Sequence, residues 1–201
     1  MLNTGIFWKE MSGIKMALQH FKNVIPPKSI KLLLVTEAPP LTKENYFYNL
    51  SSNDHSHDSS RSFFRGIMQG MGLLSVGISS YSEHKLLGAF MSKGYFVIDS
   101  CPVPLVDEQG KQLSSSKKKQ IMAKYTDSLL ETIKQLNPER ILFICSTNEV
   151  VLNKLKSHSY ISERLLTTRP IPYPGVGWLR RPDKKGFMDL LPSNYRLFPM
   201  Y

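Results

Sequence analysis

Three short apolar runs stand out along the chain, each between polar or proline-containing segments. They occupy residues 31–36 (KLLLVT), 94–100 (GYFVIDS) and 140–146 (RILFICS). A continuous apolar run of this length, bounded by turn residues, is typical of a strand buried on both faces of a sheet. We therefore predict three buried strands, and a fourth near residues 164–169, where the pattern is weaker.

Apolar residues at helical spacing separate these runs. Steps of three and four predict an amphipathic helix over residues 7–25, ended by Pro26, and further helices over residues 63–71 and 120–136. Parallel strands need crossover connections, which such helices supply. We predict a three-layer α/β/α sandwich with a mainly parallel four-stranded sheet, formed as a single domain by residues 1–201.

The amino-acid composition limits the classes of protein to which the chain can belong. The chain has 201 residues, of which 41% are hydrophobic and 21% are charged. These are ordinary values for a globular protein, and they exclude a membrane-spanning, a disordered or a fibrous chain. Lysine and arginine number 26 against 16 acidic residues, so the formal charge is +10. This excess favours a polyanionic partner, with nucleic acid first and an acidic membrane surface second.

Cysteine usage and the N-terminal residues indicate the cellular compartment in which we expect the protein. Cys101 and Cys145 each follow an apolar run and lie far apart in the sequence, so we expect no disulfide framework, no metal site and no iron–sulfur cofactor. The first residues lack the continuous apolar centre of a secretory signal. We expect a cytoplasmic protein with reduced thiols and no cofactor.

The loops that follow the apolar runs hold the candidate chemistry, because ligands in open α/β sheets bind beyond the carboxyl ends of the strands. The first loop reads TEAPP at residues 36–40, and aromatic residues follow at Tyr46 and Tyr48. This segment resembles the strand-then-loop motif of the uracil-DNA glycosylase superfamily. In that match Glu37, with Ala38 and Pro39, corresponds to the Glu-Ala-Pro that carries the water-activating carboxylate. Tyr46 and Tyr48 are similar to the aromatic residues that wall the base pocket in relatives, so the resemblance implies that they line a base pocket together with Ala38 and Pro39.

Other segments match the same superfamily in the same order. Asp99 or Ser100, at the end of the second apolar run, takes the place where relatives have an asparagine that reads the base. The predicted helix over residues 120–136 and the apolar run after it are similar to the family's helix, Asn-Pro stop and strand. The place of the family's minor-groove loop, His-Pro-Ser, is taken by Tyr173, Pro174 and Gly175. The histidine and the four cluster-binding cysteines are absent, so the resemblance is to a divergent member.

Two carboxylates are the candidates for catalysis and base reading. Cleavage of a glycosidic bond builds positive charge on the sugar, and Glu37 at a strand end can stabilise that charge and orient a water. Alternatively, Glu37 caps the next helix or pairs with a lysine. Asp99 either accepts an N–H from a base edge or caps the following turn.

The remaining polar candidates have mainly structural interpretations. Ser146 and Asn148 are best interpreted as a helix N-cap for the segment that follows them. His55 and His57 lie in a Ser/Asp-rich loop that we expect to be solvated, and His158 fits a surface helix position.

Two basic clusters are candidates for phosphate contact. Lys117, Lys118 and Lys119 follow three serines at a predicted helix start, where the helix dipole disfavours cations. Arg180 and Arg181 come shortly after an aromatic residue, as suits a nucleic-acid strand with stacked bases. Alternatively, these charges form solvated faces.

Together these features predict a DNA-binding protein similar to uracil-DNA glycosylases, which hydrolyses the N-glycosidic bond of a flipped, damaged base. A flipped base is required because the bond is inaccessible inside a stacked duplex. Two alternatives stay open: a non-catalytic nucleic-acid-binding module of the same fold, and a hydrolase of free nucleosides or nucleotides. We expect no membrane partner, and the oligomeric state is left open.

Overall fold

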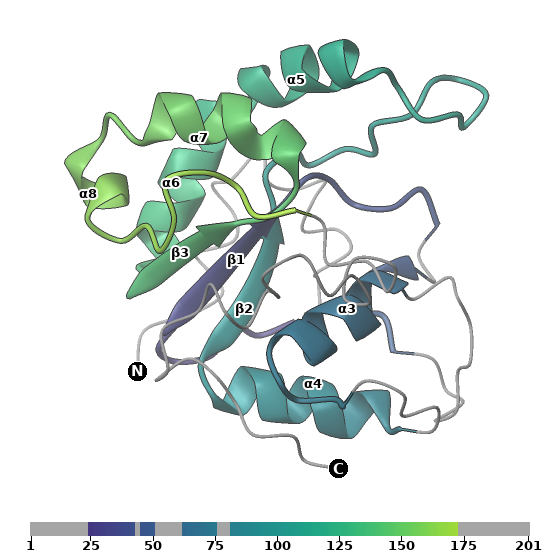
Figure 1. The fold of residues 1–201 in the computed structure, drawn as a ribbon, viewed down its shortest axis with the longest axis vertical. Coiled ribbons are helices and arrows are strands. Elements are labelled where there is room, and N and C mark those ends of the chain that lie inside the picture. The colour runs from purple at the N-terminus through teal and green to yellow at the C-terminus, as the bar shows by residue number, and fades with distance from the viewer. Residues whose placement is uncertain (1–23, 43–44, 51–61, 76–80, 173–201) are drawn as a thin grey trace, which may run out of the picture.

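The structure is a computed structural model, and it describes residues 24–42, 45–50, 62–75 and 81–172 (Figure 1). Strands alternate with helices, so the protein is of the α/β class. The elements, in chain order, are β1 (Leu32–Thr36), α3 (Ser62–Gly70), α4 (Glu83–Ser92), β2 (Tyr95–Asp99), α5 (Ser115–Lys124), α6 (Thr126–Leu136), β3 (Arg140–Phe143), the 3-10 turn η3 (Ser146–Asn148), α7 (Glu149–Leu155) and α8 (Ser159–Ser162). Every helix among these described residues is too short or too polar to cross a membrane.

The three strands form one parallel sheet in the order β2-β1-β3. In the register of the central strand, Thr36 lies opposite Asp99, and Val35 lies between Ile98 and Phe143. All five residues of β1 are buried, as a continuous apolar run predicts for a central parallel strand. The three strands predicted from the sequence are therefore confirmed.

The predicted fourth strand near residues 164–169 is not confirmed, and the sheet in the described part of the chain has three strands. This segment makes only isolated parallel bridges beside β3, from Leu165 to Ile141 and from Ile171 to Ile144. Between the two bridges the Thr167 hydroxyl donates to the carbonyl of Arg169 at 2.7 Å. This local turn interrupts the ladder.

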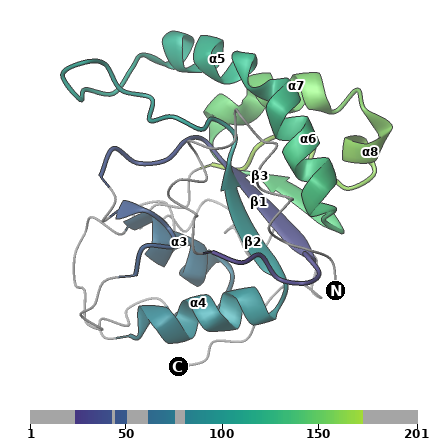
Figure 2. The same ribbon diagram turned by 180° about the vertical axis from the view of Figure 1, so that it is seen from behind.

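The helices cover the two faces of the sheet. Helices α3 and α4 lie on one side, and α6, α7 and α8 lie on the other (Figures 1 and 2). α4 packs against β2, while α5 packs against α7 and η3. Since η3 follows β3, α5 lies at the carboxyl end of the parallel sheet.

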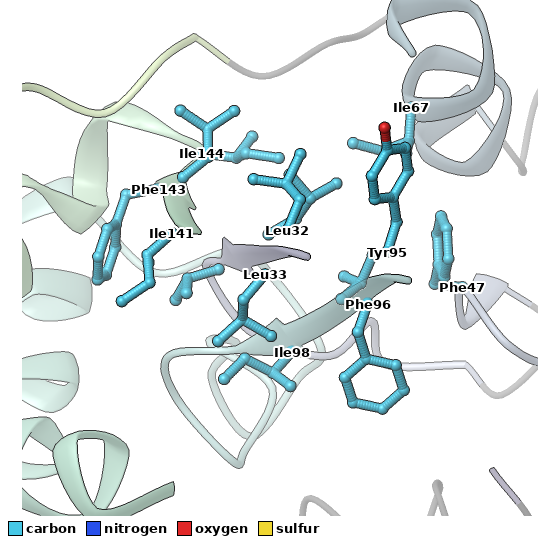
Figure 3. Packing of buried hydrophobic residues seen from close by; sticks show 14 of the residues in the cluster. Leu32, Leu33, Phe47, Ile67, Tyr95, Phe96, Ile98, Ile141, Phe143 and Ile144 are labelled. Carbon is cyan, nitrogen blue, oxygen red and sulfur yellow. The ribbon is translucent and has the colours of Figure 1, made fainter. Parts of the chain in front are cut away.

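The core is built from the strand side chains and an aromatic cluster beside β2. Leu32 and Leu33 point to opposite faces of β1, with side chains of the neighbouring strands beside them (Figure 3). The Phe47 ring contacts the rings of Tyr48, Phe64 and Phe90 at centroid separations of 5.0 to 5.6 Å. These contacts attach the segment around Phe47 to the helices on the α3 and α4 face.

The predicted helix over residues 120–136 is wrong in one respect, because the structure divides it into α5 and α6. The break is at Tyr125, with φ −98° and ψ 4°, whose N–H donates to the carbonyl of Met122 at 3.0 Å. α6 ends at Asn137, which has a left-handed φ of 43° and is followed by a proline, as predicted.

Helix α4 has no counterpart among the predicted elements. Ser82 caps it by accepting a hydrogen bond from the Lys85 N–H at 3.4 Å, and it buries Leu86 and Phe90. The predicted helix over residues 63–71 is confirmed as α3. The predicted helix over residues 7–25 lies almost entirely outside the described residues, and the Ser/Asp-rich loop that holds His55 and His57 lies wholly outside them.

Candidate functional site

The carboxyl ends of the parallel strands bring the predicted acidic residues together. Asp99 lies beside Thr36 in the β1–β2 register, and Glu37 follows Thr36 directly. Hydrogen bonds continue beyond the strands: the Ser100 N–H donates to the Thr36 carbonyl at 2.9 Å, and the Cys101 N–H donates to the Glu37 carbonyl at 3.1 Å. The Ser100 hydroxyl also donates to the Glu37 carbonyl, at 2.9 Å. The backbone under both carboxyl groups is thus fixed.

Glu37 forms an ion pair with a lysine from a different layer of the fold. The Nζ of Lys118, on α5, lies 3.3 Å from Oε2 of Glu37. The two side chains are 15% and 23% exposed, so the pair is partly shielded but still reached by water. One of the alternatives drawn from the sequence, that Glu37 pairs with a lysine, therefore describes the geometry correctly.

Asp99 lies in a more enclosed environment than Glu37. The Thr36 hydroxyl donates to its Oδ1, and the buried Tyr46 also faces its carboxyl group. Burial raises the pKa of Asp99 from 3.8 to about 6, and the negative charge of Glu37 adds to the rise, while hydrogen bonds from Thr36 and Tyr46 oppose it. Two neighbouring carboxyl groups thus have different environments.

The two predicted pocket tyrosines have different surroundings. The Tyr48 hydroxyl accepts from the Val97 N–H at 2.7 Å and donates to the Val97 carbonyl at 3.1 Å, so Tyr48 bridges into β2. Its ring packs 5.5 Å from that of Phe96. Tyr46 instead faces Asp99, and burial and that carboxyl raise the pKa of Tyr46 above its ordinary value. Tyr46 therefore belongs to the site, and Tyr48 to the core beneath it.

The neighbours of Glu37 in its loop differ in exposure. Ala38 is half-buried and packs against the core, and Pro39 is buried. A buried proline stiffens the segment that presents the carboxylate, because its φ is fixed by the ring.

Both thiols lie at the same edge of the sheet and are free. Burial raises the pKa of Cys101 to about 11 and that of Cys145 to about 12, and the carboxylates of Glu37 and Asp99 add to both shifts. Such thiols stay protonated at neutral pH and are poor nucleophiles. Cys145 also has a φ of 72°, unusual for a residue other than glycine, which redirects the chain as it leaves β3.

Asn148 occupies the N-cap position of α7, as predicted, but its side chain does not act as a cap. Its side chain makes no capping hydrogen bond to α7. The fully buried Nδ2 instead donates to the carbonyls of Ile144 at 2.6 Å and Val35 at 3.3 Å. Asn148 therefore joins the ends of β1 and β3. Its position in the sequence, after an apolar run, fits this role as well as it fits that of a helix cap.

The predicted basic residues fall into three groups. Lys117 and Lys119 are exposed on α5, whereas Lys118 points to Glu37. His158 is exposed, as expected, but it lies just before α8 and not within a helix. The other predicted contacts lie outside the described residues: Tyr173, Pro174, Gly175, Arg180 and Arg181, together with His55 and His57.

Sequence reasoning placed Lys118 among phosphate contacts and did not anticipate its pairing. Thr36, the hydrogen-bond donor to Asp99, was also missed. Within the described ranges, no three histidine, cysteine, aspartate or glutamate side chains are grouped so that they could hold a metal ion. No family model matches the chain, and no curated protein matches its sequence.

Proposed function

We propose that this protein binds DNA and hydrolyses the N-glycosidic bond of a flipped base, the reaction that its resemblance to uracil-DNA glycosylases implies. The observation that carries the proposal is the Glu37 carboxylate, held at the end of the central strand beside a second carboxyl group, Asp99. Acid and base roles are commonly divided between two such groups when their environments differ.

Glu37 has the surroundings that a water-orienting carboxylate needs. Its ion pair engages Oε2, so Oε1 is the oxygen that accepts a hydrogen bond from the attacking water. A side chain 23% exposed is open to that water and to a sugar that carries developing positive charge. A carboxylate fixed in advance stabilises this charge without reorganisation in the transition state.

Asp99 is the proposed contact to the base. Thr36 donates to its Oδ1, and Tyr46 faces the same carboxyl group, so the acceptor that it offers to a base edge is held in a fixed orientation. Burial raises its pKa to about 6, so at neutral pH most of the population is ionised and accepts an N–H. Lys117 and Lys119, exposed on the same helix as Lys118, supply the phosphate contacts.

The decisive experiment is base release from oligonucleotides that contain uracil, hypoxanthine or xanthine. Wild-type protein should release at least one of these bases and leave an alkali-labile abasic site. Glu37→Gln keeps the shape of the side chain but removes its charge, so the rate should fall by about 100-fold or more with nearly unchanged DNA affinity. Glu163→Gln, a matched change at an exposed residue beyond β3, should release base at the wild-type rate.

The other outcomes select the alternatives. DNA binding without release of any of these bases would indicate a non-catalytic module. Release from free nucleosides but not from DNA would indicate a small-molecule hydrolase. A Glu37→Gln variant as fast as wild type would assign Glu37 a purely structural ion pair.

A further inference from the structure

The lysine triplet at the start of α5 divides into one inward and two outward side chains. Met122 is fully buried and is the residue through which α5 enters the core. Lys118 precedes it by four residues, so both lie on the same face of the helix. Lys117 and Lys119 lie about 100° to either side of that direction and are exposed. Helix geometry therefore directs Lys118 toward the ends of the strands.

The start of α5 is fixed by its own hydrogen bonds. The Ser114 hydroxyl accepts from the Lys117 N–H at 3.4 Å, and the Ser114 carbonyl accepts from the Lys118 N–H at 2.9 Å. Together with the packing of α5 against η3 and α7, this cap places the Lys118 backbone above the loop that follows β3. A packed helix thus fixes the position from which the Lys118 side chain reaches Glu37.

The groups around this ammonium are acidic or neutral. Glu37, after β1, lies 3.3 Å from its Nζ, and Cys145, after β3, is within reach of its charge. Glu37 and Asp99 raise the pKa of Cys145, and Lys118 lowers it. The field of the ammonium therefore reaches the end of β3. Tyr46 adds a neutral phenol beside Asp99.

We propose that Lys118 is a positioning residue of this site: its ammonium holds the Glu37 carboxylate through Oε2 and offsets the negative charge that Glu37 and Asp99 bring together. A charge-assisted hydrogen bond of this kind fixes the orientation of the carboxylate. Lys118 thereby acts on the reaction through Glu37, and it is distinct from the phosphate contacts of Lys117 and Lys119. The inference rests on the proposed function.

The test compares Lys118→Met, which keeps the aliphatic stem, with Lys118→Arg, which keeps the charge, and with Lys124→Met, an exposed lysine of the same helix. In base release, Lys118→Met should lower kcat by about tenfold or more while KM and the DNA Kd change less than about twofold. Lys118→Arg should recover much of the loss. Lys124→Met should match wild type.

A second measurement is independent of catalysis. The side-chain carboxyl signal of Asp99 is followed by NMR against pH in the free protein. The negative charge of Glu37 raises the pKa of Asp99, so loss of the ammonium that pairs with Glu37 should raise the Asp99 midpoint further in Lys118→Met. Lys118→Arg and Lys124→Met should stay near the wild-type midpoint, and their spectra verify the fold.

The outcomes separate the two proposals. A raised KM or Kd with unchanged kcat would make Lys118 a phosphate contact and overturn the inference. An Asp99 midpoint unmoved in Lys118→Met would overturn it as well. If wild-type protein releases no base, the proposed function fails, and the Asp99 titration alone decides whether Lys118 controls the charge of the site.

Discussion

Thr36 lies directly opposite Asp99 in the parallel register of β1 and β2, and its hydroxyl donates a hydrogen bond to the Asp99 carboxyl group. The same hydroxyl lies 3.2 Å from the carbonyl of Ile98, within β2. Asp99 is therefore positioned by the sheet and not by a loop. A side chain carried by regular structure is held more precisely than one carried by a loop.

The environment of Asp99 predicts a pH dependence of stability. Its pKa is about 6 in the folded protein and near 3.8 when exposed, so the folded state binds this proton more tightly. The free energy of unfolding should therefore fall as the pH rises from about 4 to about 6, by about 2–3 kcal/mol from this group. Asp99→Asn should lack that part of the fall. Urea unfolding at several pH values measures the difference.

Asp127→Asn, at an exposed residue of α6, is the matched control and should keep the wild-type decline. Equal pH dependence in Asp99→Asn and wild-type protein would contradict the assignment of the raised pKa to Asp99.

If the exposed lysines of α5 contact phosphates, replacing them should weaken DNA binding. The double variant Lys117→Gln, Lys119→Gln should bind DNA of any sequence more weakly and should reduce the slope of log affinity against log salt by about one unit per lost phosphate contact. A titration of fluorescent duplex over a range of salt concentrations measures both quantities.

The control for this experiment is the double variant Lys85→Gln, Lys93→Gln. It removes the same charge from two exposed lysines of the α4 region, on the other side of the sheet. A purely global effect of net charge would weaken binding equally in the two double variants, and this result would remove α5 from the interface.

The buried hydrogen bonds of Asn148 predict that replacing this residue lowers the stability of the fold substantially. Asn148→Ala removes the two hydrogen bonds to Val35 and Ile144, leaves buried carbonyls without these donors and opens a small cavity. The free energy of unfolding should fall by about 2–4 kcal/mol. Asn153→Ala, at an exposed position of α7, should change it by less than about 0.5 kcal/mol. Chemical denaturation distinguishes these values, and a small effect at Asn148 would contradict its role as a link between strands.

The strands were predictable because burial on both faces leaves a direct trace in the sequence. The runs that became β1, β2 and β3 are continuous and apolar, and their order with the intervening helices predicts a parallel sheet. The split between α5 and α6 leaves no such trace. Ile121, Met122, Tyr125 and Leu129 keep helical spacing through the break at Tyr125.

The acidic half of the site was predictable, whereas its basic half was not. Glu37 and Asp99 follow apolar runs, and the ends of parallel strands meet at one edge of the sheet. The pairing of Lys118 with Glu37 spans 81 residues and depends on how α5 is placed. The spacing from Lys118 to Met122 was the available signal, since a lysine one turn from a buried methionine shares its face.

Helix α5 is joined to the fold by one fully buried side chain, Met122, and is separated from α6 by the break at Tyr125. The half-buried Ile121 adds to this contact, and α5 also packs against α7 and η3. The position of the Lys118 ammonium beside Glu37 therefore depends on how α5 packs against α7 and η3. A change in the packing around Met122 is thus expected to alter the charge beside Glu37 even though it leaves the sheet itself unchanged.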